Sequence, residues 1–199
     1  MPFEFIETDI KEVKLIVPRK FPDERGYFLE SFKESDFKKA GIVRKFSQDN
    51  HSFSVKGTLR GLHFQNPPFS QGKLVRVVRG KILDVAVDVR RGSPTFGNYV
   101  MEELSENNLR ILWVPEGFAH GFLALEDSVV LYKATSEYNQ NSEAGVFWND
   151  RTIQIKWPDI EKVISEKDQK WPELKNSKTQ FIYRNRYKGS KINRSKEIS

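Results

Sequence analysis

The chain contains 199 residues, of which 38% are hydrophobic, and it carries a formal net charge of +6. The absence of cysteine excludes disulfides, thiolate catalysis and zinc sites with cysteine ligands. No apolar run approaches the roughly 20 residues of a membrane-spanning helix, and the first residues lack a signal-peptide pattern, so we expect a cytoplasmic protein without a membrane partner.

Strand patterns dominate the chain as far as residue 135. Residues 33–40, closed by Gly41, are the best candidate for a short helix. Frequent turn residues separate many short strands, which is typical of a β-sandwich or barrel. Residues 159–175 are expected to form a short helical or irregular layer. The expected strands span residues 13–17, 27–32, 44–54, 58–65, 73–79, 81–90, 97–104, 109–114, 120–126 and 128–135.

The clearest alternation of apolar and polar residues lies in residues 82–89. One face of this strand is apolar and the other is mostly acidic; the apolar face holds Leu83, Val85, Val87 and Val89, and the other holds Asp84, Ala86 and Asp88. Such a strand can line a polar cavity or face solvent. For a single strand the solvent-facing interpretation is favoured, but the cavity interpretation is strengthened by His63, Gln65, His120 and Tyr132 on neighbouring predicted strands.

The net charge is concentrated at the end of the chain. Residues 184–199 hold six basic residues against one acid, Glu197, so the preceding residues are nearly neutral. We expect residues 1–183 to form a single domain and residues 184–199 a flexible basic tail. A basic tail can contact nucleic acid or an anionic surface, but we expect a solvated tail and no nucleic-acid partner.

Two of the three histidines lie in β-patterned, glycine-flanked segments, residues 60–65 and 115–122. Histidine changes its charge near neutral pH without help from its surroundings. His63 shares a strand face with Gln65, and a lone histidine among apolar residues is more often a core residue than a site residue. Gly61 before His63 and the tight turn before His120 favour a position at a cavity rim. His51 has no such context and is interpreted as structural.

The two histidine segments do not fit a metal site. A barrel-type site would need a His-x-His pair followed by a glutamate, whereas Gln65 occupies the second position and the next charged residue is Lys73. Two imidazoles and a neutral amide bind a divalent ion poorly, and a nearby ammonium repels it. The segments therefore indicate metal-free acid–base chemistry, to which Lys73 is suited.

Eight segments in order carry a resemblance that covers roughly residues 1–183. They resemble the dTDP-4-dehydrorhamnose 3,5-epimerase family. The resemblance implies an all-β, cupin-type double-stranded β-helix (jelly roll) with a few short peripheral helices, a homodimer, and neither metal nor organic cofactor. The segments are residues 23–30, 48–50, 60–63, 72–75, 84–88, 93–97, 115–122 and 148–150.

The resemblance also implies a reaction. The substrate would be a dTDP-4-keto-6-deoxyhexose, dTDP-4-dehydro-6-deoxy-D-glucose, inverted at carbons 3 and 5 to dTDP-4-dehydro-L-rhamnose in dTDP-L-rhamnose biosynthesis. Both carbons flank the ketone, so loss of either proton gives an enolate. By the family pattern, His63 is the base, and Asp168 orients it. Lys73 then stabilises the enolate oxygen and Tyr132 is the acid on the opposite ring face.

Substrate-binding residues follow from the same resemblance. Residues at the family positions near the diphosphate are Arg25, Arg60 and Lys167. Residues at positions with polar contacts to the sugar and base are Glu30, Gln48, Asn50, His120 and Glu143. Tyr138 stands at the position that stacks on thymine. Some of these residues are expected from the partner subunit, notably around the N-terminal strands. Asp84 is expected to pair with Lys73 or His63.

Some details depart from the pattern or remain open. Ideal alternation places Arg60 and His63 on opposite faces, so either Gly61 marks a bulge or the two serve different regions. Glu137 and Gln140 stand where the family often has an aromatic residue and a proline, respectively.

The alternative functions are a single-centre epimerase or ketoisomerase on a related 4-keto-6-deoxy sugar nucleotide, a metal-dependent cupin, and a non-catalytic sugar- or nucleic-acid-binding barrel.

Overall fold

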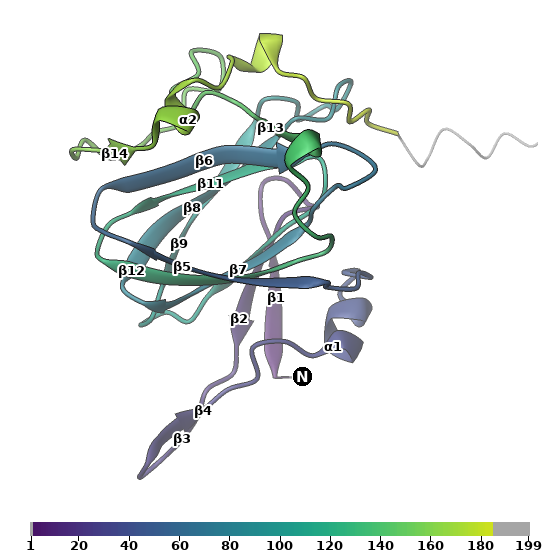
Figure 1. The fold of residues 1–199 in the computed structure, drawn as a ribbon. Helices are drawn as coiled ribbons and strands as arrows, with labels where there is room; N and C mark the ends of the chain where they lie inside the picture. Colours follow the sequence, from purple (N-terminus) through teal and green to yellow (C-terminus); the bar gives the residue numbers. More distant parts are fainter. Residues whose placement is uncertain (1, 185–199) are drawn as a thin grey trace, which may run out of the picture.

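Two antiparallel sheets face each other at the centre of the computed structural model, which describes residues 2–184 (Figure 1). The first sheet has the order β1 (Phe3–Glu7), β2 (Lys14–Pro18), β10 (Ile111–Val114), β7 (Lys73–Arg79), β12 (Ser128–Ala134) and β5 (Gln48–Ser54). The second has the order β13 (Glu143–Gly145), β6 (Thr58–Gln65), β11 (Phe118–Ala124), β8 (Lys81–Asp88) and β9 (Tyr99–Ser105). From β5 to β13, successive strands therefore alternate between the two sheets, except for the pair β8 and β9, as in the predicted jelly roll.

The space between the sheets is filled by inward-facing apolar side chains, including Leu15, Val75, Ala86 and Phe122. Ala86 packs there from the face of β8 that also carries the buried Asp84, while Val85 packs on the outer face of the second sheet. The alternation predicted for this strand is confirmed. Its acidic face points into the molecule rather than into solvent.

The outer faces of both sheets are partly covered by peripheral segments. The second sheet is covered by the C-terminal segment (Figure 1), which contains β14 (Val163–Ile164), α2 (Glu166–Gln169) and the 3₁₀ turn η2 (Leu174–Asn176). β14 pairs in parallel with β6. The first sheet is covered by α1 (Glu34–Lys39), whose Phe37 packs edge-on against Phe3 at 5.2 Å between ring centroids.

Helix α1 matches its predicted range closely. Glu34 and Asp36 lie in the first turn and Lys38 and Lys39 in the last, which suits the helix dipole. Gly41 follows with φ +86°, a conformation that favours glycine. The remaining short elements are the hairpin β3 (Phe21–Asp23) and β4 (Gly26–Phe28), and the 3₁₀ turn η1 (Gln140–Ser142).

The structure contains strands that were not predicted, and some predicted strands have other bounds. β1 was not predicted, and it pairs with β2 through residues 3–7. The strand expected at 27–32 is only the arm Gly26–Phe28 of a hairpin, and the strand expected from residue 44 starts at Gln48. The predicted basic tail lies outside the described residues except for Arg184.

Candidate active site

A cavity opens between the two sheets where β5, β6, β7, β11 and β12 meet the segment that carries α2. Its wall contains both sequence-predicted histidines and all four residues predicted to be catalytic. The lining residues are Ser52, Arg60, His63, Lys73, His120, Gly121, Phe122, Tyr132, Ser165, Lys167 and Asp168.

A bulge in β6 brings Arg60 and His63 to the same cavity. His63 pairs with His120 on β11, and Arg60 pairs with Phe122. The two pairs are three residues apart on β6 but only two apart on β11, so β6 contains one extra residue. Gly61 lies within the bulge at φ +124°, and a Cβ there would be 2.6 Å from the Cα of Gly121. Only glycine fits this backbone position. Of the two explanations for Gly61, the bulge is therefore confirmed.

His63 and Asp168 form a close pair. Nε2 of His63 lies 2.6 Å from Oδ1 of Asp168, and Oδ2 accepts a hydrogen bond from the Gly61 N–H at 3.2 Å. Burial alone would raise the pKa of Asp168, but the hydrogen bond with His63 and its charge hold that pKa below its usual value. A carboxylate only accepts, so in neutral His63 Nε2 carries the hydrogen and Nδ1 keeps a lone pair.

Asp168 reaches this position through the short helix α2. Ser165 caps the helix by accepting a hydrogen bond from the Asp168 N–H at 3.1 Å. The Asp168 side chain is buried against β6, 105 residues away in sequence from its partner. The C-terminal segment thus supplies one functional residue to a cavity otherwise built by the jelly roll.

Lys73 and Tyr132 come from the other sheet. The Lys73 ammonium lies 5.9 Å from the centroid of the Tyr132 ring. Burial lowers the pKa of Lys73 to about 8, although the charges of Asp84 and Glu143 oppose that shift. Burial raises the pKa of Tyr132, with the Arg60 charge opposing it, so the phenol keeps its proton at neutral pH.

Asp84 pairs with His120 rather than with either predicted partner. Oδ1 of Asp84 lies 2.7 Å from Nε2 of His120, and no hydrogen bond joins Asp84 to Lys73 or His63 among the described residues. The predicted direct pair with Lys73 or His63 is therefore not formed, although the negative charge of Asp84 acts on Lys73. The reason is register: on adjacent strands, Asp84 faces Phe122, so His120 is its diagonal neighbour.

A hydrogen-bonded network beside the cavity joins five of the predicted binding residues. Gln48 donates to Asn50 at 2.8 Å and accepts from the Tyr138 N–H at 2.7 Å. The Tyr138 hydroxyl donates to Glu143 at 2.9 Å, and Lys167 forms an ion pair with Glu143 at 2.6 Å. The Tyr138 ring is about half exposed, at 53%, so its face is available to a ligand.

Arg25 and Glu30 lie away from this cavity. Arg25 is at the tip of the β3–β4 hairpin, which projects from the body (Figure 1), and it pairs with Asp23 while remaining 84% exposed. Glu30 lies 3.9 Å from Lys33 in a different hollow, lined also by Arg19 and Phe28. The structure of one chain therefore does not bring these two predicted residues to the others.

Sequence reasoning missed several cavity residues. Ser52 lines the cavity from β5, and its buried hydroxyl has no hydrogen-bond partner among the described residues. It has the same strand parity as Gln48 and Asn50, which was an available signal. In the sequence, Phe122 cannot be distinguished from an ordinary core residue, and Ser165 cannot be distinguished from an ordinary helix-capping residue.

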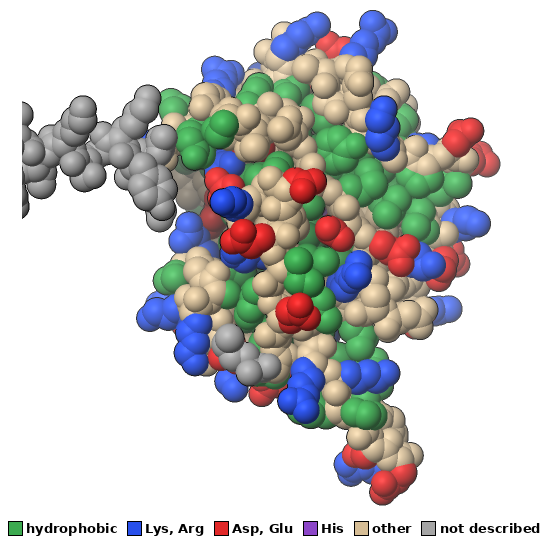
Figure 2. All heavy atoms as spheres, turned by 180° about the vertical axis from the view of Figure 1, so that it is seen from behind, with side chains coloured by type: hydrophobic (Ala, Val, Ile, Leu, Met, Phe, Trp, Pro, Cys, Tyr) green, Lys and Arg blue, Asp and Glu red, His purple; other side chains and the backbone are tan. Residues whose placement is uncertain are grey.

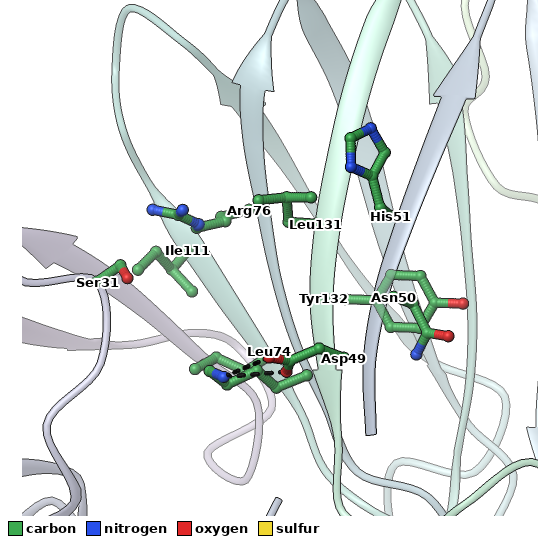
Figure 3. Close-up of a pocket in the computed structure, with 10 residues that line it drawn as sticks. Ser31, Asp49, Asn50, His51, Leu74, Arg76, Ile111, Leu131 and Tyr132 are labelled. Atoms are coloured by element: carbon green, nitrogen blue, oxygen red, sulfur yellow. Dashed lines mark hydrogen bonds and ion pairs between the residues drawn. The ribbon is translucent and has the colours of Figure 1, made fainter. Parts of the chain in front are cut away.

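A second hollow lies on the outer face of the first sheet (Figure 3), with Arg76, Ile111 and Leu131 among its lining residues. Tyr132 and Asn50 also line this hollow, and Figure 3 shows the side chains of Leu131 and Tyr132 on opposite sides of β12. His51 lines the outer hollow and is not among the residues that line the cavity with His63. This agrees with the expectation that His51 takes no part in the chemistry.

Within residues 2–184, no group of three or more histidine and carboxylate side chains is placed to hold a metal ion. No helix in that range is long and apolar enough to cross a membrane. On the face shown in Figure 2, basic and acidic side chains are interspersed. The expectations of no metal and no nucleic-acid partner stay predictions.

The matching family model decides the relationship of this chain to known proteins. The model described as dTDP-4-dehydrorhamnose 3,5-epimerase matches residues 7–176. The chain belongs to the dTDP-4-dehydrorhamnose 3,5-epimerase family. The suspected resemblance is thereby confirmed, and the match covers the segment that carries Asp168 and both sheets apart from most of β1.

Individual family members agree with this assignment. The dTDP-4-dehydrorhamnose 3,5-epimerase of Sinorhizobium fredii is 52% identical over 182 residues, covering 90% of this chain and 93% of that protein. The crystal structure of the Sulfolobus tokodaii epimerase aligns with a TM-score of 0.85 at 50% identity, covering 90% of this chain and 99% of that one. The Legionella pneumophila epimerase, solved in complex with dTDP-4-keto-L-rhamnose, aligns with a TM-score of 0.85 at 44% identity, covering 87% and 94%. These solved family structures confirm the predicted fold class.

Proposed function

We propose that this chain is a dTDP-4-dehydrorhamnose 3,5-epimerase, an isomerase that converts dTDP-4-dehydro-6-deoxy-D-glucose to dTDP-4-dehydro-L-rhamnose. The observation that carries the proposal is the position of the two proton-transfer groups. His63 lies on β6 of the second sheet and Tyr132 on β12 of the first, and both line one cavity. A base and an acid on opposite walls suit inversion, in which the proton leaves one ring face and returns to the other.

The first step removes a proton next to the ketone. Nδ1 of His63 takes the proton from carbon 3 or carbon 5, and the C–H electron pair forms the enolate, with negative charge on the carbon-4 oxygen. Asp168 supports the imidazolium through the 2.6 Å contact with Nε2. The Lys73 ammonium faces the same cavity, where a fixed positive charge stabilises the enolate more than the neutral ketone.

The second step returns a proton from the opposite side. Tyr132 donates its hydroxyl proton to the ring carbon, the enolate collapses to the ketone, and the configuration is inverted. The tyrosinate then regains a proton and His63 loses one, so no atoms are gained or lost overall. The same groups serve both centres because both carbons flank one ketone.

Nucleotide binding falls to residues around the cavity. Arg60 and Lys167 supply positive charge for the diphosphate, and guanidinium and ammonium groups suit phosphate oxygens. The exposed Tyr138 ring is the stacking surface for thymine. Gln48, Asn50 and Glu143 hold that ring in place through the network described above, and they supply polar contacts to the sugar and base.

We further propose a homodimer in the cytoplasm in which the partner's hairpin completes each cavity. The β3–β4 hairpin exposes Tyr27 and Phe28, at 51% and 66%, and projects from the body with Arg25 at its tip (Figure 1). An extended arm with exposed aromatic side chains is suited to contact a second copy. The partner's Arg25 would then meet the diphosphate, with Glu30 at the base of the same arm.

The proposal is tested by following the substrate in heavy water by proton NMR, with the product drawn off by a 4-keto reductase. Deuterium at both carbon 3 and carbon 5 of an L-rhamno product is the expected result. Deuterium at one carbon only would replace the proposal with a single-centre epimerase, and movement of the ketone would replace it with a ketoisomerase. No turnover would overturn it. Loss of activity on exhaustive chelation would point to a metal cupin.

A further inference from the structure

Asp84 is the most deeply buried charged residue near the cavity, and the proposed chemistry does not use it. Its side chain has no solvent exposure. Oδ1 is bound to Nε2 of His120 at 2.7 Å, whereas Oδ2 has no hydrogen-bond partner among the described residues. A buried carboxylate with one unpaired oxygen is costly. The free-energy cost of burying this carboxylate must therefore be offset by a nearby positive charge, or Asp84 must have a role in function.

Lys73 supplies positive charge that acts on Asp84. Lys73 lies on β7 of the facing sheet, and the Asp84 charge favours its protonated form against the effect of burial. Without that carboxylate, burial would drive the pKa of Lys73 below the value of about 8 that it has with Asp84 present. Asp84 thus favours the ammonium form of Lys73 that is needed at the enolate oxygen.

Asp84 also decides which nitrogen of His120 carries the hydrogen. Burial lowers the pKa of His120, with Asp84 opposing and the charge of Lys73 adding to the shift, so the ring is neutral at pH 7. Because the carboxylate only accepts, Nε2 must carry the hydrogen. Nδ1 is then left with a lone pair, in a residue that lines the cavity.

We propose that Asp84 is a positioning residue that holds His120 as the Nε2–H tautomer and Lys73 as the ammonium. The cavity then presents one acceptor and one cation to neighbouring oxygens of the sugar. A ketone oxygen accepts and suits Lys73, whereas a hydroxyl donates and suits Nδ1 of His120. The pair therefore selects a ketone with an adjacent hydroxyl, and this selection rests on the proposed function.

Other charged groups around this pair are accounted for. Arg60 and His63 enter from β6, Tyr132 from β12, Glu143 from β13, and Lys167 and Asp168 from α2. His63 is paired with Asp168, and Glu143 with Lys167 and Tyr138. Asp84 is the carboxylate that contacts His120 directly.

The first test is the tautomer of His120 in the free enzyme, read by nitrogen-15 NMR of histidine-labelled protein at pH 7. The chain has three histidines, so His51→Asn and His63→Asn variants assign the signals. We expect hydrogen on Nε2 of His120 in the wild type. A hydrogen on Nδ1, or on both nitrogens, would overturn the proposal. This result does not depend on turnover, so it is separable from a failure of the proposed function.

The second test is Asp84→Asn, which keeps the shape and removes the charge. We expect the His120 tautomer no longer to be fixed, because the amide can present either its oxygen or its NH2 group to Nε2. The alkaline loss of kcat should move to lower pH by about one unit or more, because Lys73 loses the negative charge that favours its ammonium form. The ratio of kcat/KM for the substrate to kcat/KM for its 3-deoxy analogue should fall about tenfold, because Nδ1 of His120 no longer accepts from the sugar hydroxyl. An unchanged pH midpoint and an unchanged preference in a folded variant would overturn the proposal.

Asp88→Asn is the matched control. Asp88 lies on the same strand, is equally buried, and is bound by Arg90, Ser93 and Thr95 instead of cavity residues. Its substitution should lower stability without moving the His120 tautomer or the pH midpoint of kcat. If both variants moved the midpoint equally, Asp84 would have only a structural role. If Asp84→Asn does not fold, the wild-type tautomer still decides the first half of the proposal.

Discussion

The imidazole of His63 and the carboxylate of Asp168 lie 2.6 Å apart although 105 residues separate them in the chain. Two backbone features bring them together: the bulge at Gly61 turns His63 into the cavity, and the capped helix α2 presents Asp168 from the covering segment. Asp168 also accepts from the Gly61 N–H, so one carboxylate holds both the ring and the bulge. The base is therefore positioned by tertiary contacts rather than by its strand alone.

Replacing His63 with alanine is expected to stop exchange of both the carbon-3 and carbon-5 protons, because one base serves both. The loss should be on the order of 10²–10⁴-fold, the range for removing a positioned general base. Proton NMR in heavy water measures both exchanges at once. His51→Ala is the control: that ring lies in the outer hollow, so exchange should persist. Exchange near the wild-type rate in His63→Ala would refute the assignment.

Replacing Tyr132 with phenylalanine is expected to impair proton return more than proton loss. The variant keeps the ring beside Lys73 and removes only the hydroxyl. Exchange of substrate protons with solvent should therefore outrun formation of the inverted product, and the two rates can be compared in one NMR time course. Turnover equal to the wild type would show that another group is the acid.

Lys73 is expected to set an alkaline limit on activity. Its ammonium has a pKa of about 8, so kcat should fall as the pH rises through that value and the positive charge at the enolate oxygen is lost. A pH–rate profile in which activity holds to pH 10 would contradict this. The measurement requires only the wild-type enzyme and a coupled assay.

The buried charge of Lys73 should also lower the free energy of unfolding. Because folding lowers the pKa of Lys73 from 10.5, the cost is fully present below about pH 8 and disappears as the pH rises toward 10.5. Lys73→Met should therefore raise the free energy of unfolding at pH 7 by a few kcal/mol, while abolishing turnover. Lys170→Met is the control, since that lysine is exposed and its loss should change little. A Lys73→Met variant less stable than wild type at pH 7 would count against this account.

Strand alternation was the part of the fold that could be predicted from the sequence alone. Val85 and Ala86 point to opposite sides of the second sheet, as their spacing requires. The inward direction of Asp84 followed from the same pattern, but its partner did not, because a diagonal contact depends on the register between β8 and β11. The strand β1 was also missed, and its pairing with β2 along its whole length defines it.

Residues in covering segments were predictable only through the family resemblance. Asp168 lies in a four-residue helix whose local sequence resembles any charged surface turn. The Arg60–His63 relation was left open because alternation places them apart, and only the bulge brings them together. The position of Arg25 could not be predicted from one chain. No local sequence pattern shows whether an extended hairpin contacts the cavity of its own chain or that of a second copy.

Gly61→Ala is expected to lose both stability and activity. A Cβ at φ +124° would be strained, and it would lie 2.6 Å from Gly121 Cα and 2.8 Å from the His120 carbonyl oxygen. The unfolding free energy should fall by more than about 2 kcal/mol, since strain and overpacking add. Gly41→Ala provides the comparison: φ is also positive, +86°, but no atom lies within 4 Å, so its cost should be near 1 kcal/mol. Equal losses in thermal or urea unfolding would mean that the close approach does not matter.

Mixing two inactive variants tests whether Arg25 acts on the partner's cavity. Arg25→Ala and His63→Ala chains are unfolded together and refolded as mixed dimers. If Arg25 acts across the dimer, one of the two sites in each mixed dimer has both residues intact. Random pairing of the two chains in a two-fold dimer should then restore about a quarter of wild-type activity.

Pairing His63→Ala with Lys73→Ala is the control for this mixing experiment, because both residues line the cavity of one chain and no mixed dimer has an intact site. That mixture should stay inactive. Restoration in the first mixture alone would establish that the exposed hairpin, which places Arg25 far from its own His63, completes the neighbouring cavity. No restoration in the first mixture would assign Arg25 to its own chain, and the β3–β4 hairpin would then have to fold back toward the cavity when substrate binds.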